Sequence, residues 1–176
     1  SIIDAAHADG IDTIITCDNG IAAIDQIKHA KDLGMTVIVT DHHDIGFKEV
    51  EGERIYVLPE ADAVVNPKRM DCEYPFGGIC GGVVAYKVIE QLYQECGIAK
   101  AEMEPLLEFA AIATVCDVMD LVEENRDIVR FGLENMNHTT NIGLRALIEE
   151  TGIGDKRISV YHLGFVIGPC INASDV

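Results

Sequence analysis

Four adjacent side chains with metal-binding groups, Asp41, His42, His43 and Asp44, follow the apolar residues 37–39 and Thr40. A run of β-branched residues is typical of a buried parallel strand. In open α/β sheets, ligands bind outside the carboxyl ends of such strands. Imidazole nitrogens and carboxylate oxygens bind Mn²⁺, Fe²⁺ or Zn²⁺. A solvated loop can also carry His and Asp, but four of them at the end of an apolar strand favour a metal site.

A second candidate ligand, Asp18, follows an earlier β-rich stretch. We expect a strand at residues 11–16, a helix at 21–33 and a second strand at 35–40, which together form a βαβ unit. Both strands then point the same way, about 4.8 Å apart, so Asp18 and His42 leave the sheet at the same edge and can share an ion. On its own, Asp18 in Asp-Asn-Gly is equally typical of a helix cap or a turn.

A third carboxylate, Asp117, follows an apolar helix expected at residues 102–114. A carboxylate in apolar surroundings needs a cation or a hydrogen-bond donor to offset the loss of hydration. Asp117 is therefore a candidate ligand, and Asp120 is a weaker one. The alternative is a capped helix end or a surface loop.

Two basic residues, Lys68 and Arg69, follow a third expected strand at residues 63–65. They are either phosphate contacts at the strand end or solvated charges. Four glycines in residues 77–82 allow close approach of the backbone to a phosphate or to a neighbouring element. They do not form a P-loop, because no Gly-Lys-Ser/Thr follows.

The order of the remaining elements predicts an α/β fold, with a parallel sheet flanked by helices and a mostly helical C-terminal part. Residues 46–63 are expected to form an irregular surface excursion. Residues 168–173 are expected to form a turn after the last helix. The further helices are expected at residues 1–7, 83–96, 124–136, 141–151 and 158–166.

The composition suits one globular domain of 176 residues that is 48% apolar. No apolar run approaches the roughly 18 residues of a membrane span, and no secretion signal is present, so we expect no membrane association. The six cysteines form no Cys-x-x-Cys pair and favour reduced thiols in the cytoplasm. The net charge of −17 opposes binding to nucleic acid unless cations, a local basic patch or a basic partner domain compensate.

A set of segments in fixed order resembles the DHH phosphoesterases over nearly the whole chain. They are Thr-Cys-Asp-Asn-Gly-Ile (16–21), Val-Thr-Asp-His-His (39–43), Val-Asn-Pro-Lys-Arg (65–69), Cys-Gly-Gly-Val-Val-Ala-Tyr-Lys (80–87), Ala-Thr-Val-Cys-Asp-Val-Met-Asp-Leu (113–121), Glu-Asn-Arg (124–126), Gly-Leu-Arg-Ala-Leu (143–147) and Ile-Gly-Pro-Cys-Ile-Asn-Ala (167–173).

This resemblance implies hydrolysis of phosphodiesters at a site for two Mn²⁺ or Mg²⁺ ions. Within the superfamily the segments resemble the 5′→3′ exonucleases that act on single-stranded DNA in recombination and repair. Single-stranded DNA is then the substrate, and DNA-repair proteins are the expected partners.

The resemblance also assigns roles to single residues. It implies that Asp18 bridges the ions and that His42 and Asp117 are metal ligands. It implies that His43 touches the scissile phosphate or supports the site, and that Asp41 orients its neighbours or acts directly. Asn172 matches a segment associated with binding substrate phosphates. Lys68 and Arg69 are candidates for the same role.

Two departures from the family pattern limit these expectations. The family's first motif, Asp-x-Asp, is expected upstream of Ser1, so residues 1–176 are expected to be a DHH domain that lacks this motif and any downstream domain. We therefore expect the isolated chain to hold at most one ion weakly and to have negligible nuclease activity. Near the C-terminus, Cys170 replaces an arginine and Asp175 a glycine.

Two other functions fit the same residues. One is a DHH phosphodiesterase for short oligonucleotides or cyclic dinucleotides, or a pyrophosphatase, which keeps the fold and changes the substrate. The other is a non-catalytic binding module derived from such an enzyme. The presence of Asp18, His42, His43 and Asp117 argues against the second alternative, whereas the absence of the first motif argues for it.

Overall fold

The computed structural model describes residues 1–173 and divides the chain into two compact units, residues 1–77 and 78–176. Asp175, one of the two departures from the family pattern, lies outside the described residues.

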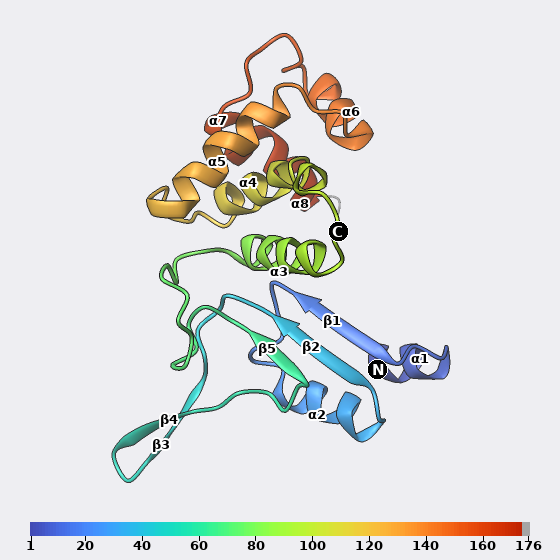
Figure 1. The fold of residues 1–176 in the computed structure, drawn as a ribbon, viewed down its shortest axis with the longest axis vertical. Helices are drawn as coiled ribbons and strands as arrows, with labels where there is room; N and C mark the ends of the chain where they lie inside the picture. Colours follow the sequence, from blue (N-terminus) through green and yellow to red (C-terminus); the bar gives the residue numbers. More distant parts are fainter. Residues whose placement is uncertain (174–176) are drawn as a thin grey trace. The chain divides into compact units, whose positions relative to one another are not determined.

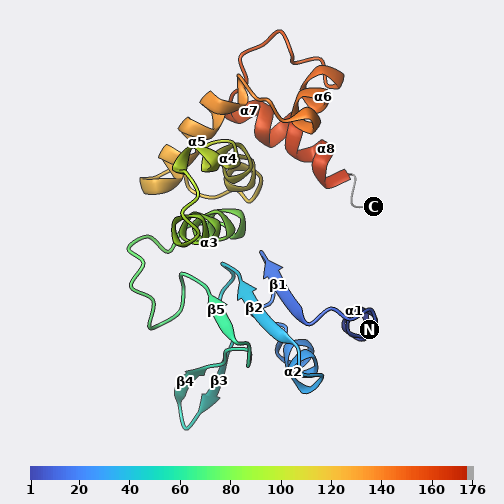
Figure 2. The same cartoon turned by 45° about the vertical axis from the view of Figure 1, so that its right-hand side comes forward.

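The first unit is built around a three-stranded parallel sheet in the order β1-β2-β5 (Figure 1). These strands are β1 (Thr13–Cys17), β2 (Thr36–Thr40) and β5 (Ala63–Val65). Helix α2 (Ile24–Asp32) connects β1 to β2 and lies against one face of the sheet, as Figure 2 shows, while α1 (Ile2–Ala8) precedes β1. Ile27 and Ala30 of α2 pack with Val37 and Val39 of β2, which explains the apolar run in that strand.

The prediction of an irregular excursion at residues 46–63 was wrong. This stretch contains an antiparallel hairpin, β3 (Phe47–Val50) and β4 (Glu53–Tyr56), which stands away from the sheet (Figure 1). Its two-residue turn places Glu51 and Gly52 at φ 54° and 86°, the backbone that favours tight hairpins. All residues of both strands are exposed, so the sequence lacks the apolar alternation by which a half-buried strand is recognised.

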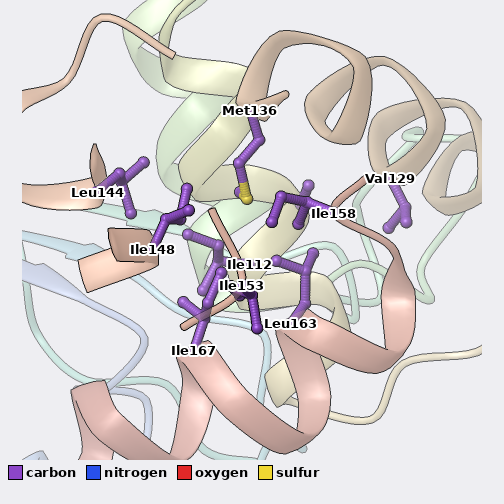
Figure 3. Packing of buried hydrophobic residues seen from close by; sticks show 10 residues of the cluster. Ile112, Val129, Met136, Leu144, Ile148, Ile153, Ile158, Leu163 and Ile167 are labelled. Atoms are coloured by element: carbon purple, nitrogen blue, oxygen red, sulfur yellow. The ribbon is translucent and has the colours of Figure 1, made fainter. Parts of the chain in front are cut away.

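The second unit is helical, and its core gathers apolar side chains from five segments (Figure 3). Ile112, Met136, Ile148, Ile158 and Leu163 are among the residues of this core. The predicted α/β fold with a parallel sheet and a helical C-terminal part is confirmed. Among the described residues, no helix has the length and apolar character needed to cross a membrane. The elements are α3 (Gly81–Glu95), η1 (Lys100–Met103), α4 (Leu106–Cys116), α5 (Glu123–Met136), α6 (Ile142–Glu150), α7 (Val160–His162), the π-helical η2 (Leu163–Ile167) and α8 (Gly168–Ala173).

The prediction of a turn at residues 168–173 was also wrong, because these residues form α8. The chain runs from α7 through η2 into α8 without leaving helical structure. Pro169 has no N–H to donate, but it stands in the first turn of α8, where a missing donor is tolerated. The wider π-helical turn just before it accommodates the change in hydrogen bonding.

Small residues set the contacts of α4 with its neighbours. A Cβ at Gly82 of α3 would collide with Ala113, so this glycine serves close packing with a neighbouring helix. A Cβ at Gly132 of α5 would collide with Ala111 and with the carbonyl oxygen of Leu107. The contact between α4 and α5 therefore requires glycine at position 132.

Gly132→Ala is expected to lower the free energy of unfolding by about 1–3 kcal/mol, the usual cost of overpacking a core, despite the better helix propensity of alanine. Urea denaturation would measure this change. Gly164→Ala is the matched control, since its Cβ would meet Val115 only at 3.5 Å, an ordinary contact. Equal stability of the two variants would contradict the packing argument.

Candidate metal centre

The three parallel strands end side by side, with Cys17, Thr40 and Val65 in register. The next residue of each strand therefore lies at the same edge of the sheet. The N–H of Asp18 donates to the carbonyl of Thr40 at 2.9 Å, and the N–H of Asp41 donates to that of Val65 at 3.0 Å. These bonds extend the ladder by one residue and place Asp18 and Asp41 on neighbouring strand ends.

The backbone of Asp18 adopts a left-handed conformation with φ 61°, which Asp tolerates better than most residues. The turn after it is held by the Thr16 hydroxyl, which donates to the carbonyl of Asn19 at 2.7 Å. Gly20, at φ 109°, lets the chain pass close to Thr16, whose Oγ1 would lie 2.9 Å from an added Cβ. The loop thus leaves the strand sharply and places the Asp18 carboxylate at the sheet edge.

Asp18, His42 and His43 form a cluster in which one possible ligand atom from each residue lies within 4.8 Å of the others. His42 Nε2 is 3.1 Å from Asp18 Oδ1, and the two imidazole centroids are 4.5 Å apart. His42 is 7% exposed, whereas Asp18 and His43 are open to solvent. The predicted meeting of Asp18 and His42 is therefore seen in the structure, and His43 joins them.

Asp41 is buried beneath this cluster and accepts hydrogen bonds through both carboxylate oxygens. Oδ2 accepts from the N–H of Ile21 at 2.8 Å, and Oδ1 accepts from the N–H groups of His42 and His43 at 2.7 and 3.1 Å. Burial alone would raise the pKa of the Asp41 carboxyl, but these bonds together with the His43 ring outweigh it and hold that pKa below its ordinary value.

The same carboxylate orients the ring of His43. His43 Nδ1 lies 2.7 Å from Asp41 Oδ1, so in the neutral ring Nδ1 carries the proton and Nε2 carries the lone pair. A ligand histidine in metalloproteins commonly donates its second N–H to a carboxylate in this way. The family resemblance implied that Asp41 orients its neighbours or acts directly, and the contact with His43 is compatible with the first role, which stays a prediction.

Asn66 is a supporting residue that the sequence reasoning missed. It is buried, its Nδ2 donates to the carbonyl of His43 at 3.0 Å, and its Oδ1 accepts from the N–H of Lys68 at 2.8 Å. It thereby ties the loop after β5 to the loop that carries the histidines. Its place directly after a strand, in line with Asp18 and Asp41, was the signal available.

The two basic candidates for phosphate binding are both engaged with carboxylates. Lys68 Nζ lies 2.8 Å from Asp44, which is itself largely exposed. Arg69 donates to both oxygens of Asp71 at 2.9 and 2.6 Å and to the carbonyl of Val64 at 2.5 Å. A phosphate would have to replace these partners, so the role of either residue in binding substrate stays a prediction.

The remaining candidates, Asp117 and Asn172, belong to the second unit. Asp117 ends α4, and the next residue, Val118, has φ 55°, a strained conformation for a β-branched side chain. Asn172 lies on α8 and is exposed, as is Cys170. The cluster at the sheet edge consists of residues of the first unit. The roles of Asp117 as a metal ligand and of Asn172 as a phosphate contact therefore stay predictions.

The donor set at the sheet edge fits a divalent metal of the Mn²⁺ type. One carboxylate and two imidazoles are ligands of intermediate hardness, and no thiolate belongs to the cluster among the described residues. A cation bound to the cluster would also be linked to the Asp41 carboxylate through the ring of His43. The arrangement can therefore bind a cation and present it to a ligand that approaches from solvent.

The chain is similar to known proteins of one family. Residues 2–114 match the model of the DHH family, N-terminal domain. The chain is 38% identical over 164 residues to the single-stranded-DNA-specific exonuclease RecJ of Bacillus subtilis, covering 93% of this chain and 19% of that protein. The chain therefore spans about a fifth of the length of this relative.

Solved structures show the same fold. RecJ of Thermus thermophilus in complex with Mn²⁺ superposes with a TM-score of 0.77 at 28% identity, over 97% of this chain and 24% of that one. An exonuclease RecJ bound to manganese gives a TM-score of 0.76 at 27% identity, over 96% of this chain and 40% of that one. Both of these structures contain manganese, a metal that the donor set at the sheet edge fits.

Proposed function

Because the chain belongs to the DHH family, we propose that it carries part of the active site of a metal-dependent phosphodiesterase, which in the full-length protein is a 5′→3′ exonuclease on single-stranded DNA. The observation that carries the proposal is the convergence of Asp18, His42 and His43 above the buried Asp41. Similarity to RecJ exonucleases over nearly the whole chain supports this substrate.

The residues divide into ligands and positioning groups. Asp18 and His42 would hold Mn²⁺ or Mg²⁺, with His43 as a third donor through Nε2, because Asp41 occupies its Nδ1. Asp117 would complete the site in the full-length protein, where the family uses two ions. When bound, the ions supply activated water and offset charge on the phosphate. Lys68, Arg69 and Asn172 would contact substrate phosphates.

Bound cations also answer the electrostatic objection raised by the net charge of −17. An acidic surface repels DNA at long range, but ions at the sheet edge reverse the local sign of the field. We further propose a cytoplasmic enzyme that works with DNA-repair proteins. The six cysteines, all free, support a reducing compartment.

A cleavage panel on the full-length protein tests this function. With Mn²⁺ added, 5′-end-labelled single-stranded DNA is expected to release mononucleotides, while blunt duplex, dinucleotides and pyrophosphate react far more slowly. EDTA should abolish the release and excess Mn²⁺ should restore it. Preference for dinucleotides or pyrophosphate would instead favour the short-substrate DHH enzymes. Binding of DNA without any cleavage would favour a non-catalytic module.

A further inference from the structure

Two exposed aromatic rings are stacked on the helical segment that follows α6. Tyr161 of α7 and Phe165 of η2 are 64% and 72% exposed, with ring centroids 5.1 Å apart and planes inclined by 29°. Being four residues apart, they lie on one face of the helix. The core of this unit is formed by other residues of the same segment, such as Leu163 and Ile167. The aromatic pair therefore contributes an exposed π-surface rather than packing.

A groove of about 640 Å³ is lined by Tyr161 and by two arginines. Arg157 is exposed and makes no ion pair among residues 1–173. Arg130 lies over the ring of Phe131 at 4.4 Å and is 3.6 Å from Asp127, a loose and exposed pair. Glu134 also lines the groove and brings one negative charge to it. Asn137 and Ser159 also line the groove, but the Asn137 amide donates to the carbonyls of Leu133 and Ile158, and the Ser159 hydroxyl lies 2.9 Å from His162 Nδ1.

The charge of this region differs from that of the chain as a whole. Residues 137–173 contain as many basic as acidic residues, whereas the full chain has a net charge of −17. Excess negative charge is thus concentrated before residue 137. The groove itself is lined by two arginines and one glutamate, an excess of one positive charge, and Arg157 is exposed there.

We propose that Tyr161, Phe165, Arg157 and Arg130, together the aromatic–arginine surface, bind single-stranded nucleic acid. Exposed rings stack with unpaired bases of any sequence, and arginines at their side neutralise the backbone. A duplex offers no free base faces to such rings, so the surface selects single strands. This inference rests on the proposed function and assigns part of its substrate recognition to the helical unit.

Binding of a 20-nucleotide dT strand to the full-length protein in EDTA, followed by fluorescence anisotropy, tests the surface. Tyr161→Ala and Phe165→Ala are each expected to weaken binding about 5- to 100-fold, the range for loss of one stacking partner. Tyr161→Trp, which keeps an aromatic ring at this position, should bind dT as the wild type does. Arg157→Gln should reduce the slope of log K against log salt by about 0.7.

The matched control is Phe47→Ala. Phe47 and Tyr56 form an exposed aromatic pair on the β3–β4 hairpin, with centroids 6.2 Å apart in an edge-to-face arrangement, and Arg54 lies over Phe47. This pair, like the first, consists of one Phe and one Tyr, but its rings are not stacked on each other. Phe47→Ala should therefore bind dT as the wild type does.

A second measurement separates this inference from the proposed function. In Mn²⁺, the KM for cleavage of the dT strand should rise in Tyr161→Ala while kcat stays near the wild-type value, because the ring contributes to binding the strand and not to the reaction. Wild-type affinity in Tyr161→Ala, Phe165→Ala and Arg157→Gln would overturn the aromatic–arginine surface. A wild type that binds dT but cleaves no substrate would overturn the exonuclease and leave the binding surface standing.

Discussion

His42→Ala is expected to lower the rate of DNA cleavage by the full-length protein about 10³-fold or more. The imidazole of His42 is the buried member of the cluster, with Nε2 3.1 Å from the Asp18 carboxylate. Its removal takes a nitrogen ligand from the cation and leaves a cavity that water enters. Metal ions contribute several kcal/mol to the stabilisation of a phosphoryl transition state, and about 4 kcal/mol corresponds to a factor of 10³.

Two measurements show whether the loss comes from the metal. Titration with Mn²⁺, followed by calorimetry, should show weaker binding in His42→Ala, and excess Mn²⁺ should recover little of the rate. His29→Ala is the matched control, because His29 Nε2 also lies beside a carboxylate, Asp4, at 2.7 Å, but on the exposed side of α2. The assignment fails if both variants retain the wild-type rate, or if His42→Ala loses activity only by unfolding.

The part of the site that the sequence predicted correctly is the part that topology determines. Asp18 and His42 are 24 positions apart, yet both follow strands joined by one crossover helix. Parallel pairing of β1 and β2 then brings them to one edge, whatever the details of the side chains. This is why a pattern of strand, helix and strand was enough to predict their contact.

The part that could not be predicted depends on local hydrogen bonds. The place of Asn66 after a strand marked it as a candidate, but the sequence does not show that its side chain donates to the carbonyl of His43, since Asn before Pro is typical of any turn. Arg69 can pair either with a carboxylate two residues away or with an external phosphate, and in the structure it pairs with the carboxylate of Asp71. The sequence contains both possibilities.

The two misassigned segments have different physical causes. The β3–β4 hairpin has no buried face, so its strands do not alternate between apolar and polar residues. In residues 168–173, Gly168 and Pro169 suggested a turn because both residues commonly end helices. The structure shows that proline is compatible with a helix when it stands at the start of a new helical turn.

Asp41→Asn is expected to lower the cleavage rate about 10- to 100-fold, the usual cost of losing the group that orients a ligand histidine. It should also lower the free energy of unfolding by about 2 kcal/mol. The carboxylate accepts from three donors through Oδ1 and from Ile21 through Oδ2. An amide accepts on one side only, so its NH₂ group must face an N–H and leave a buried donor unsatisfied.

Asp62→Asn provides the control that separates positioning from stability. The Asp62 carboxylate also accepts a backbone N–H, that of Val37 at 2.7 Å, and it pairs with Lys31 at the opposite end of β2. Its replacement should cost less stability than that of Asp41, since the ion pair is partly exposed, and should leave the cleavage rate at the wild-type value. Urea denaturation and initial rates on both variants measure the two effects separately. If Asp41→Asn were destabilised but cleaved DNA at the wild-type rate, Asp41 would support the sheet edge without orienting His43, and the assignment of Nε2 as the metal-binding nitrogen would lose its basis.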